Sequence, residues 1–247
     1  MRPEVDASGT VQCTYVGWRL PAVAFHATLA CNAGGIERNG LHSASTLIEA
    51  AELVDSNYRA PRAYRNRTVM LPTGAALRDQ RPMAPEFLAR CLDPPLSVTD
   101  WYHLVNARVF FWIDLKRLTT YLNASAGSDQ VVYTVDIQAL ILKYADSMEV
   151  TPFNVGYAKR RGAPRGLRTF VSLAAWTRTG WAEERAAGRK PRSAYALPVE
   201  LAVRSSIPDF DHYVIKRHVV FRRPTDRDSS SQTHIATAVR DGRGTPR

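Results

Sequence analysis

Short apolar runs alternate with capped, amphipathic stretches from about residue 20 to residue 222. Runs of β-branched and aromatic residues with period two predict strands. We place these at residues 11–18, 22–29, 69–71, 108–113, 130–135, 150–155, 169–173, 197–203 and 218–222. Apolar residues spaced three and four apart predict short helices, which we place at residues 33–39, 84–92, 101–105, 115–122 and 137–144, with one more after Ser43. Because no long helix alternates regularly with the strands, we expect an α+β fold in a single domain.

Polar residues and glycines mark the element ends. Gly40 suits the end of the first helix, and Ser43 or Ser45 suits the start of the next. Thr99 or Asp100 and then Asp136 are expected to cap two later helices. Residues 156–166 and 177–192, rich in Gly and Arg, are expected to be loops. The serine run and missing periodicity after residue 222 predict a domain over 1–222 and a disordered basic tail over 223–247.

The composition narrows the class of protein. Of 247 residues, 45% are hydrophobic and 23% charged, which is typical of a soluble protein. No run approaches the roughly 18 apolar residues that cross a bilayer. The three cysteines and six histidines lack disulfide or metal-ligand spacing. We therefore expect a cytoplasmic, bacterial-type protein without a metal or a membrane segment.

The net charge of +10 is unevenly placed. Residues 159–192 hold ten basic side chains and two acidic ones, and four arginines cluster between residues 59 and 67. Such patches favour a polyanionic partner. A solvated basic surface is the alternative.

Glu200 lies in a strand-like run in which Leu197, Val199, Leu201 and Val203 alternate with other residues. Period two sends Glu200 to the opposite face. One carboxylate between apolar neighbours suits a catalytic acid that lines a cleft. An exposed strand glutamate fits the same pattern.

Two further motifs hold groups suited to a nucleotide. His26-x-Thr28, followed by Gly40-Leu41, presents an imidazole and a hydroxyl that can bind ribose hydroxyls and an amide; a core histidine beside a capping threonine is the alternative. The strand at 108–113 places Phe110 and Trp112 on one face, where they can stack on a planar ring or pack in the core.

Residues 78–83 bring two arginines, a carboxylate and an amide into one turn. Arginine forks bind pyrophosphate bidentately, although an internal Arg–Asp pair could equally fix the loop. Asn154-Val155-Gly156 and Pro164-Arg165-Gly166 allow the backbone to approach a ligand closely, and they also suit ordinary hairpins.

Taken in order, these pieces resemble ADP-ribosyltransferases. His26-x-Thr28 with Gly40-Leu41 looks like the first motif of DarT-type DNA ADP-ribosyltransferases and RNA 2′-phosphotransferases, and the strand around Glu200 looks like the one carrying the DarT-type catalytic glutamate. The full set more closely resembles an uncharacterised bacterial family of unknown function over most of residues 20–221. Its shared motifs are Arg78-Asp79-Gln80-x-Pro82-Met83, Asp100-Trp101-Tyr102, Asn106-x-Arg108-Val109-Phe110-Phe111-Trp112, Asn154-x-Gly156 and Arg165-Gly166-x-x-Thr169-Phe170.

The resemblance implies an ADP-ribosyltransferase-like split β-sheet and NAD as substrate. It implies catalysis by Glu200 with His26 and an arginine, for which Arg78 and Arg67 are both candidates. The residues expected to contact NAD are His26, Thr28, Gly40, Leu41, Tyr102, Arg108, Phe110 and Trp112. The chain departs from the DarT-type pattern by having Phe110-Phe111-Trp112 where a tyrosine-containing strand is usual.

In ADP-ribosyltransferases, which this chain resembles, the connection before the catalytic strand tends to form the acceptor-recognition loop. Its basic charge here predicts DNA or RNA, with a DNA base favoured. The expected contacts are Arg160, Arg161, Arg165, Arg168, Trp176 and Trp181. The alternatives are an NAD glycohydrolase toxin, a non-enzymatic nucleic-acid-binding module, and a structural or small-ligand-binding protein. A toxin would also imply an antitoxin or hydrolase partner.

Overall fold

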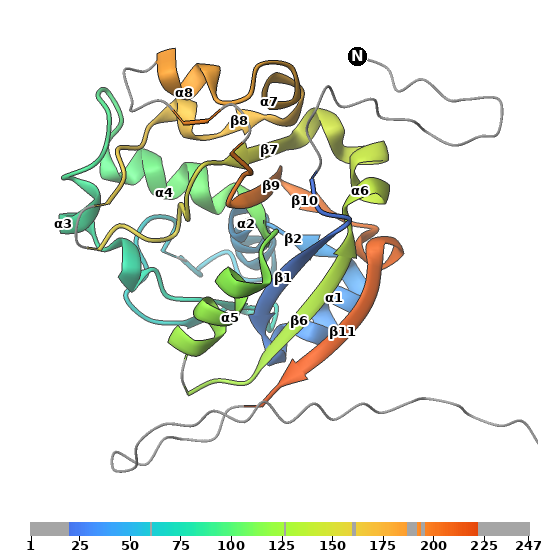
Figure 1. Cartoon of the computed structure of the whole chain (residues 1–247). Coiled ribbons are helices and arrows are strands. Elements are labelled where there is room, and N and C mark those ends of the chain that lie inside the picture. The colour runs from blue at the N-terminus through green and yellow to red at the C-terminus, as the bar shows by residue number, and fades with distance from the viewer. Residues whose placement is uncertain are drawn as a thin grey trace, which may run out of the picture.

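An antiparallel sheet of seven strands, in the order β11-β6-β1-β5-β9-β7-β8, forms the framework (Figure 1). The computed structural model describes residues 20–221, except 60, 126, 160–161, 187–191 and 194–195. The strands are β1 (Val23–Leu29), β5 (Arg108–Trp112), β6 (Gln130–Asp136), β7 (Met148–Thr151), β8 (Val171–Ser172), β9 (Glu200–Arg204) and β11 (Val214–Val220). Two small ribbons pair β2 (Leu41–His42) with β10 (Ser206–Ile207) and β3 (Val69–Met70) with β4 (Ala76–Leu77).

The sheet splits between β1 and β5. Seven residue pairs join β1 to β6, whereas Phe25–Trp112 is the one registered pair between β1 and β5. On the other side, five pairs join β5 to β9. The expected α+β fold with a split sheet and short helices is therefore confirmed.

The helices surround this sheet. They are α1 (Ala33–Asn39), α2 (Ala44–Val54), α3 (Pro85–Leu88), α4 (Val98–Asn106), α5 (Leu115–Ala124), α6 (Ile137–Tyr144), α7 (Leu173–Thr179) and α8 (Ala182–Ala186). The predictions for α1 and α6 match the observed bounds, because each has a clear local stop or cap: Gly40 after α1, and the Asp136 carboxylate accepting from the first turn of α6.

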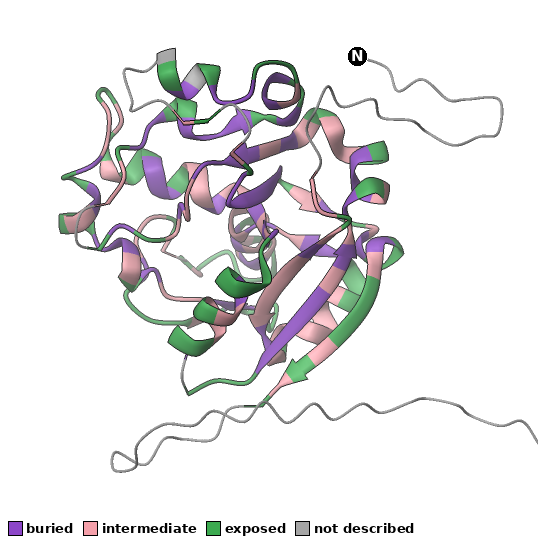
Figure 2. Ribbon diagram, in the orientation of Figure 1, coloured by how far each residue is buried: buried purple, intermediate pink, exposed green. Residues whose placement is uncertain are grey.

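Burial follows position in the sheet. Figure 2 shows buried residues along β6 and exposed ones along β11, which is an edge strand. In β9 the first four residues are all buried, because β5 and β7 flank this strand and its two faces are covered. Helix α4 and its neighbours form a second core with Trp101, Tyr102 and Leu88 at its centre.

Several predicted elements were wrong. The strand predicted at 169–173 is confirmed only at β8 (Val171–Ser172), because the Ser172 hydroxyl accepts from the Ala175 N–H and caps α7, which starts at Leu173. Together α7 and α8 fill much of the predicted loop 177–192. The strand predicted at 150–155 ends at Thr151, where Pro152 lacks an N–H for the ladder. Helix α3 ends at Leu88, short of the predicted residue 92. The predicted strand 11–18 and the tail 223–247 lie outside the described residues.

The cap of α4 is Ser97, two residues before the predicted Thr99 and three before the predicted Asp100. The Ser97 hydroxyl accepts from the Asp100 N–H at 3.1 Å, and the Asp100 carboxylate accepts from the Ser97 N–H at 2.8 Å. Replacing Ser97 by Ala should lower the free energy of unfolding by about 1 kcal/mol, because the Asp100 N–H loses its acceptor and the Asp100 carboxylate loses the bond from the Ser97 hydroxyl.

The matched control is Thr99→Ala, an exposed position inside the helix, where alanine should be neutral or slightly stabilising. Urea denaturation of the two variants measures the difference. Equal effects at both positions would contradict the assignment of the cap.

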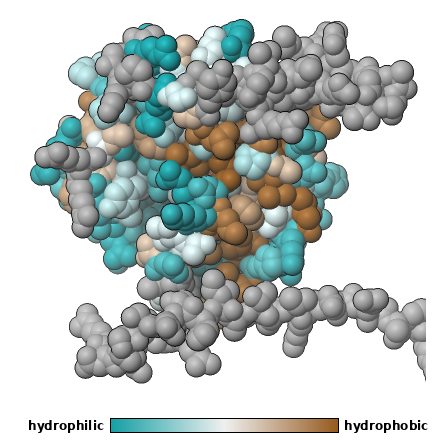
Figure 3. All heavy atoms as spheres, in the orientation of Figure 1, coloured by the Kyte–Doolittle hydropathy of each residue, from teal (hydrophilic) through white to brown (hydrophobic). Residues whose placement is uncertain are grey.

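On the face shown in Figure 3, hydrophobic residues gather at the middle and polar residues frame them. None of the described helices combines the length and apolar character that crossing a membrane requires.

Candidate active site

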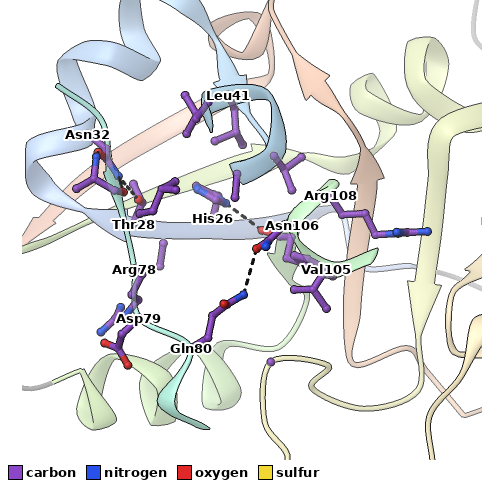
Figure 4. A pocket seen from close by; sticks show the side chains of 18 of the residues that line it. His26, Thr28, Asn32, Leu41, Arg78, Asp79, Gln80, Val105, Asn106 and Arg108 are labelled. Carbon is purple, nitrogen blue, oxygen red and sulfur yellow. Dashed lines mark hydrogen bonds between the residues drawn. The ribbon is translucent and has the colours of Figure 1, made fainter. Parts of the chain in front are cut away.

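A cavity of about 1270 Å³ lies where β1 and β5 part. It is larger than most small-molecule pockets, which span roughly 300–1,000 Å³. Its wall is built from β1, the junction of α1 with β2, the segment 73–83, β5, α5 and the loop 154–159, with Glu200 at the start of β9. Figure 4 shows part of this wall, with His26, Thr28, Arg78 and Gln80 around one space. The sequence motifs at both ends of the chain thus meet in one cavity.

Glu200 is 4% exposed and stands in the sheet between Trp112 and Thr151. Its Oε2 accepts from the Val155 N–H at 3.0 Å and from the Thr151 hydroxyl at 3.1 Å. Burial raises the pKa of Glu200 to about 7, although these two donors act to lower it. The alternative of an exposed strand glutamate is wrong. A carboxyl group that titrates near neutral pH can either donate or accept a proton.

The loop that holds Glu200 is itself held by Arg165. This side chain is 1% exposed, and its guanidinium donates to the carbonyls of Val155 (3.1 Å), Tyr157 (3.0 Å) and Ala163 (3.1 Å). Val155 therefore receives a bond from Arg165 at its carbonyl and gives one to Glu200 from its N–H. Arg165 was predicted to contact nucleic acid, and its burial rules out that role.

His26 and Thr28 lie two residues apart on β1, and both line the cavity. His26 Nδ1 lies 2.9 Å from the Phe110 carbonyl oxygen, which can only accept, so Nδ1 carries the proton and Nε2 is an acceptor. Burial lowers the pKa of His26, so the ring is neutral at pH 7. The Thr28 hydroxyl accepts from Asn32 Nδ2 at 2.9 Å and keeps its own proton to donate.

Asn32 also ties the opposite wall to β1. Its Nδ2 donates to the Ala76 carbonyl at 3.0 Å, and its Oδ1 accepts from the Ala76 N–H at 2.8 Å. Asn32 was missed in the sequence, where an asparagine before a helix indicates only a cap.

Gly40 and Leu41 line the same cavity. Gly40 has φ 82°, and a Cβ there would lie 2.3 Å from the Pro208 carbonyl oxygen. The chain therefore needs glycine here to pass close to Pro208. Leu41 then pairs with Ile207 in the β2–β10 ribbon.

Among the predicted aromatic contacts, Phe110 and Trp112 stand half-buried in the cavity wall. Trp112 also packs on Tyr121, with ring centroids 5.7 Å apart. Tyr102 was predicted to contact NAD, but it is 1% exposed, lies outside the cavity and donates its hydroxyl to the Met83 carbonyl. Tyr102 belongs to the core beside α4.

Arg108 was also predicted to contact NAD. Its guanidinium forms a bidentate pair with Glu149 at 2.6 and 3.2 Å and stacks over Phe170 at 4.0 Å. In Figure 4 its side chain points away from the other labelled residues. Arg108 contributes to the cavity wall, but its positive charge is compensated by Glu149 within the protein.

Arg67 and Arg78, the two candidates for the catalytic arginine, lie in different places. Arg67 is exposed and does not line the cavity, whereas Arg78 does. Arg78 Nη1 donates to the Tyr121 hydroxyl and to Gln130 Oε1 (3.2 Å), and its guanidinium lies 5.0 Å from the Tyr121 ring centroid. The neighbouring Arg81 pairs with Asp79 at 2.9 Å, as in the internal-pair alternative.

A third arginine, Arg65, also lines the cavity and is 6% exposed. The sequence placed Arg65 only within a basic cluster. Nothing in the local pattern separates it from Arg62 or Arg67.

The two tryptophans that were predicted to contact nucleic acid lie in the protein core. Trp176 is 0% exposed and Trp181 is 1% exposed, and the two rings pack on each other with centroids 6.2 Å apart. Neither indole has a face open to a base, so their predicted stacking role is wrong. Arg168 is exposed, while Arg160 and Arg161 lie outside the described residues.

Other basic side chains stand at the cavity mouth. Exposed residues that line the cavity include Arg38, Arg81, Arg117 and Lys159. Within the part of the chain that the structure describes, no three His, Cys, Asp or Glu side chains are grouped to hold a metal ion.

The sequence model of a family of unknown function (DUF7002) matches residues 22–214, which include every strand of the large sheet except the edge strand β11, reached only at its first residue. The chain belongs to the DUF7002 family. The predicted membership of an uncharacterised family is therefore confirmed.

No curated protein matches this DUF7002 chain. Two similar solved structures are of Thermus sp. 2.9 DarT. The complex with ADP-ribosylated ssDNA has 13% identity and a TM-score of 0.34, covering 77% of this chain and 78% of that one. The complex with NAD⁺ has 15% identity and a TM-score of 0.33, covering 77% and 79%. Similarity this low leaves the function to be argued from the residues of the DUF7002 chain itself.

Proposed function

We propose that this DUF7002 protein is an NAD-dependent ADP-ribosyltransferase that modifies a nucleic acid, with a DNA base favoured over RNA. One observation carries the proposal: the buried carboxyl of Glu200 lines the same cavity as His26 and Thr28. The cavity is also large enough for a dinucleotide.

In the proposed reaction the bond between the nicotinamide nitrogen and ribose C1′ breaks. Nicotinamide leaves with the bonding electron pair, and positive charge develops on the ribose. The ionised Glu200 accepts a hydrogen bond from the ribose 2′-hydroxyl and stabilises this charge. The acceptor then bonds to C1′ and gives its proton to Glu200.

The remaining cavity residues bind and orient NAD in this proposal. His26 Nε2 and the Thr28 hydroxyl offer an acceptor and a donor for ribose hydroxyls or the amide. Phe110 and Trp112 offer aromatic faces for the nicotinamide ring. Arg78, which was predicted to clamp the pyrophosphate or orient the acceptor, also lines the cavity.

Exposed basic residues around the cavity mouth support a nucleic-acid acceptor. Arg38, Arg117 and Lys159 are exposed there, and such groups bind phosphate in any sequence. The predicted toxin role, cytoplasmic location, antitoxin or hydrolase partner, and domain limits of 1–222 stay predictions.

Incubation with labelled NAD and separate pools of DNA, RNA and protein tests the proposal. We expect nicotinamide release with label in the DNA pool. Release without transfer would identify an NAD glycohydrolase. Oligonucleotide binding with intact NAD would identify a non-enzymatic binding module. Intact NAD in every pool contradicts the proposed enzyme.

The acceptor has a separate test. Affinity for a single-stranded oligonucleotide should fall steeply between about 50 and 200 mM salt, because bound phosphates release counterions. Fluorescence anisotropy measures this slope. A flat slope would favour a protein or small-molecule acceptor.

A further inference from the structure

Arg65 is a buried cation at the cavity wall with no carboxylate partner. It is 6% exposed, and no carboxylate among the described residues forms an ion pair with it. The negative charge of Asp79 acts to raise the pKa of Arg65, but the Asp79 carboxylate is itself paired with Arg81 at 2.9 Å. Burial lowers the pKa of Arg65 to about 10, which reflects the cost of keeping this charge away from water. A buried charge is normally compensated by a partner of opposite sign.

A polar network fixes the orientation of the guanidinium. Its Nε donates to the Arg78 carbonyl at 3.1 Å, and its Nη2 donates to Asn106 Oδ1 at 3.0 Å. Gln80 donates to the same Asn106 oxygen at 3.1 Å and accepts from the Arg65 N–H at 3.1 Å. Gln80 and Asn106 also line the cavity, and Figure 4 shows the bond between them.

The third nitrogen of this guanidinium has no partner. Arg65 Nη1 is enclosed and makes no hydrogen bond in the part of the chain that the structure describes. Buried donors are nearly always paired in proteins, and an unpaired charged donor is more costly than a neutral one. Two nitrogens of the Arg65 guanidinium therefore bond to the protein, while the third has no acceptor. Arg65 itself lines the cavity.

We propose that Arg65 is an anion-binding residue of this cavity: its uncompensated charge attracts a phosphate group of the ligand, and Nη1, which is covered in this structure, donates to a phosphate oxygen when ligand binding uncovers it. A guanidinium is a strong donor to phosphate oxygens. The network of Asn106 and Gln80 holds this donor in place before the ligand binds, so little side-chain entropy is lost on binding. Identification of the phosphate as the pyrophosphate of NAD rests on the proposed function.

This assignment differs from both arginines expected from the sequence. Arg67 is outside the cavity, and the Arg78 guanidinium already donates to Tyr121 and Gln130. Arg65 is the arginine of the three that combines burial, a place at the cavity wall and an unused donor.

The test is titration calorimetry of the full chain with sodium pyrophosphate and with ADP-ribose at constant ionic strength. Arg65→Met should weaken both ligands by about 10- to 100-fold, the range expected for loss of one hydrogen bond to a charged group. Arg67→Met is the matched control, since it removes the same charge from an exposed position two residues away, and its affinities should not change.

Several outcomes overturn the proposal. They are unchanged affinity in Arg65→Met, an equal loss in Arg67→Met, and no binding of either ligand by the wild type. If Arg65→Met does not fold, a crystal structure of the wild type with pyrophosphate decides. A phosphate oxygen bonded to Nη1 supports the proposal, and a water molecule alone at Nη1 with the ligand elsewhere overturns it.

These assays need no turnover, so they separate this proposal from the proposed function. If Arg65→Met loses pyrophosphate while the wild type leaves NAD intact, the anion site stands and the transferase does not. If the wild type cleaves NAD but Arg65→Met binds pyrophosphate normally, the transferase stands and the anion site does not.

Discussion

Glu200→Gln is expected to slow NAD cleavage by roughly 10²–10⁴-fold while the protein stays folded, the usual effect of losing a group that transfers a proton. Glutamine keeps the size of the side chain but carries no negative charge to stabilise the developing ribose cation. The rate of the wild type should rise as the pH increases through about 7, because the ionised form of Glu200 is the active one.

Nicotinamide release, measured at saturating NAD, gives the rate for each variant. Glu86→Gln serves as control, because Glu86 is exposed on α3 and does not line the cavity, and its rate should equal that of the wild type. Circular dichroism and thermal unfolding establish that Glu200→Gln is folded. Full activity in a folded Glu200→Gln would remove the proposed mechanism.

Glu200→Gln should also change how the free energy of unfolding depends on pH, because ionisation of the buried Glu200 destabilises the folded state. The pKa of Glu200 is raised from an ordinary 4.5 to about 7 in the folded protein. Between these two values the folded state binds more protons than the unfolded state, so the stability of the wild type falls as the pH rises. The Glu200 contribution is fully lost above about pH 7 and fully restored below about pH 4.5.

Glutamine does not titrate, so Glu200→Gln lacks this pH dependence. The free energy of unfolding of Glu200→Gln minus that of the wild type should therefore increase by about 3 kcal/mol between pH 4 and pH 8, at about 1.4 kcal/mol per pKa unit. Subtraction cancels other groups that titrate alike in both proteins. Urea denaturation across this range measures the difference. A difference that stays constant would show that Glu200 ionises normally in the folded chain.

The elements that were predicted well have strong local signals. Helix α1 is ended by Gly40, and α6 begins at the Asp136 cap, so their bounds depend on residues next to them in the chain. Near residue 172 two local signals meet: the strand signal is realised only in the short β8, and the Ser172 cap then starts α7 inside the predicted strand. Burial of Trp176 and Trp181 then stabilises α7 and α8, and this packing could not be seen from the neighbouring residues.

The direction of each side chain was the less predictable part of the site. His26, Thr28 and Glu200 were recognised from their motifs, and the fold brings them to one cavity. Tyr102 and Arg165 stood in equally distinct motifs, yet both are buried and bonded to backbone carbonyls. A sequence motif does not indicate whether a polar side chain binds a ligand or forms hydrogen bonds within the protein.

From the sequence alone came the α+β class, most strands of the split sheet, the membership of an uncharacterised family, and the pairing of an early His-x-Thr motif with a late glutamate. The tertiary structure alone decided that Glu200 is buried, and that Arg65 rather than Arg67 reaches the cavity. The physical reason is that propensity, caps and period depend on nearby residues. Burial, pKa and the partner of a charge depend instead on contacts such as Arg65 with Asn106, which are 41 residues apart.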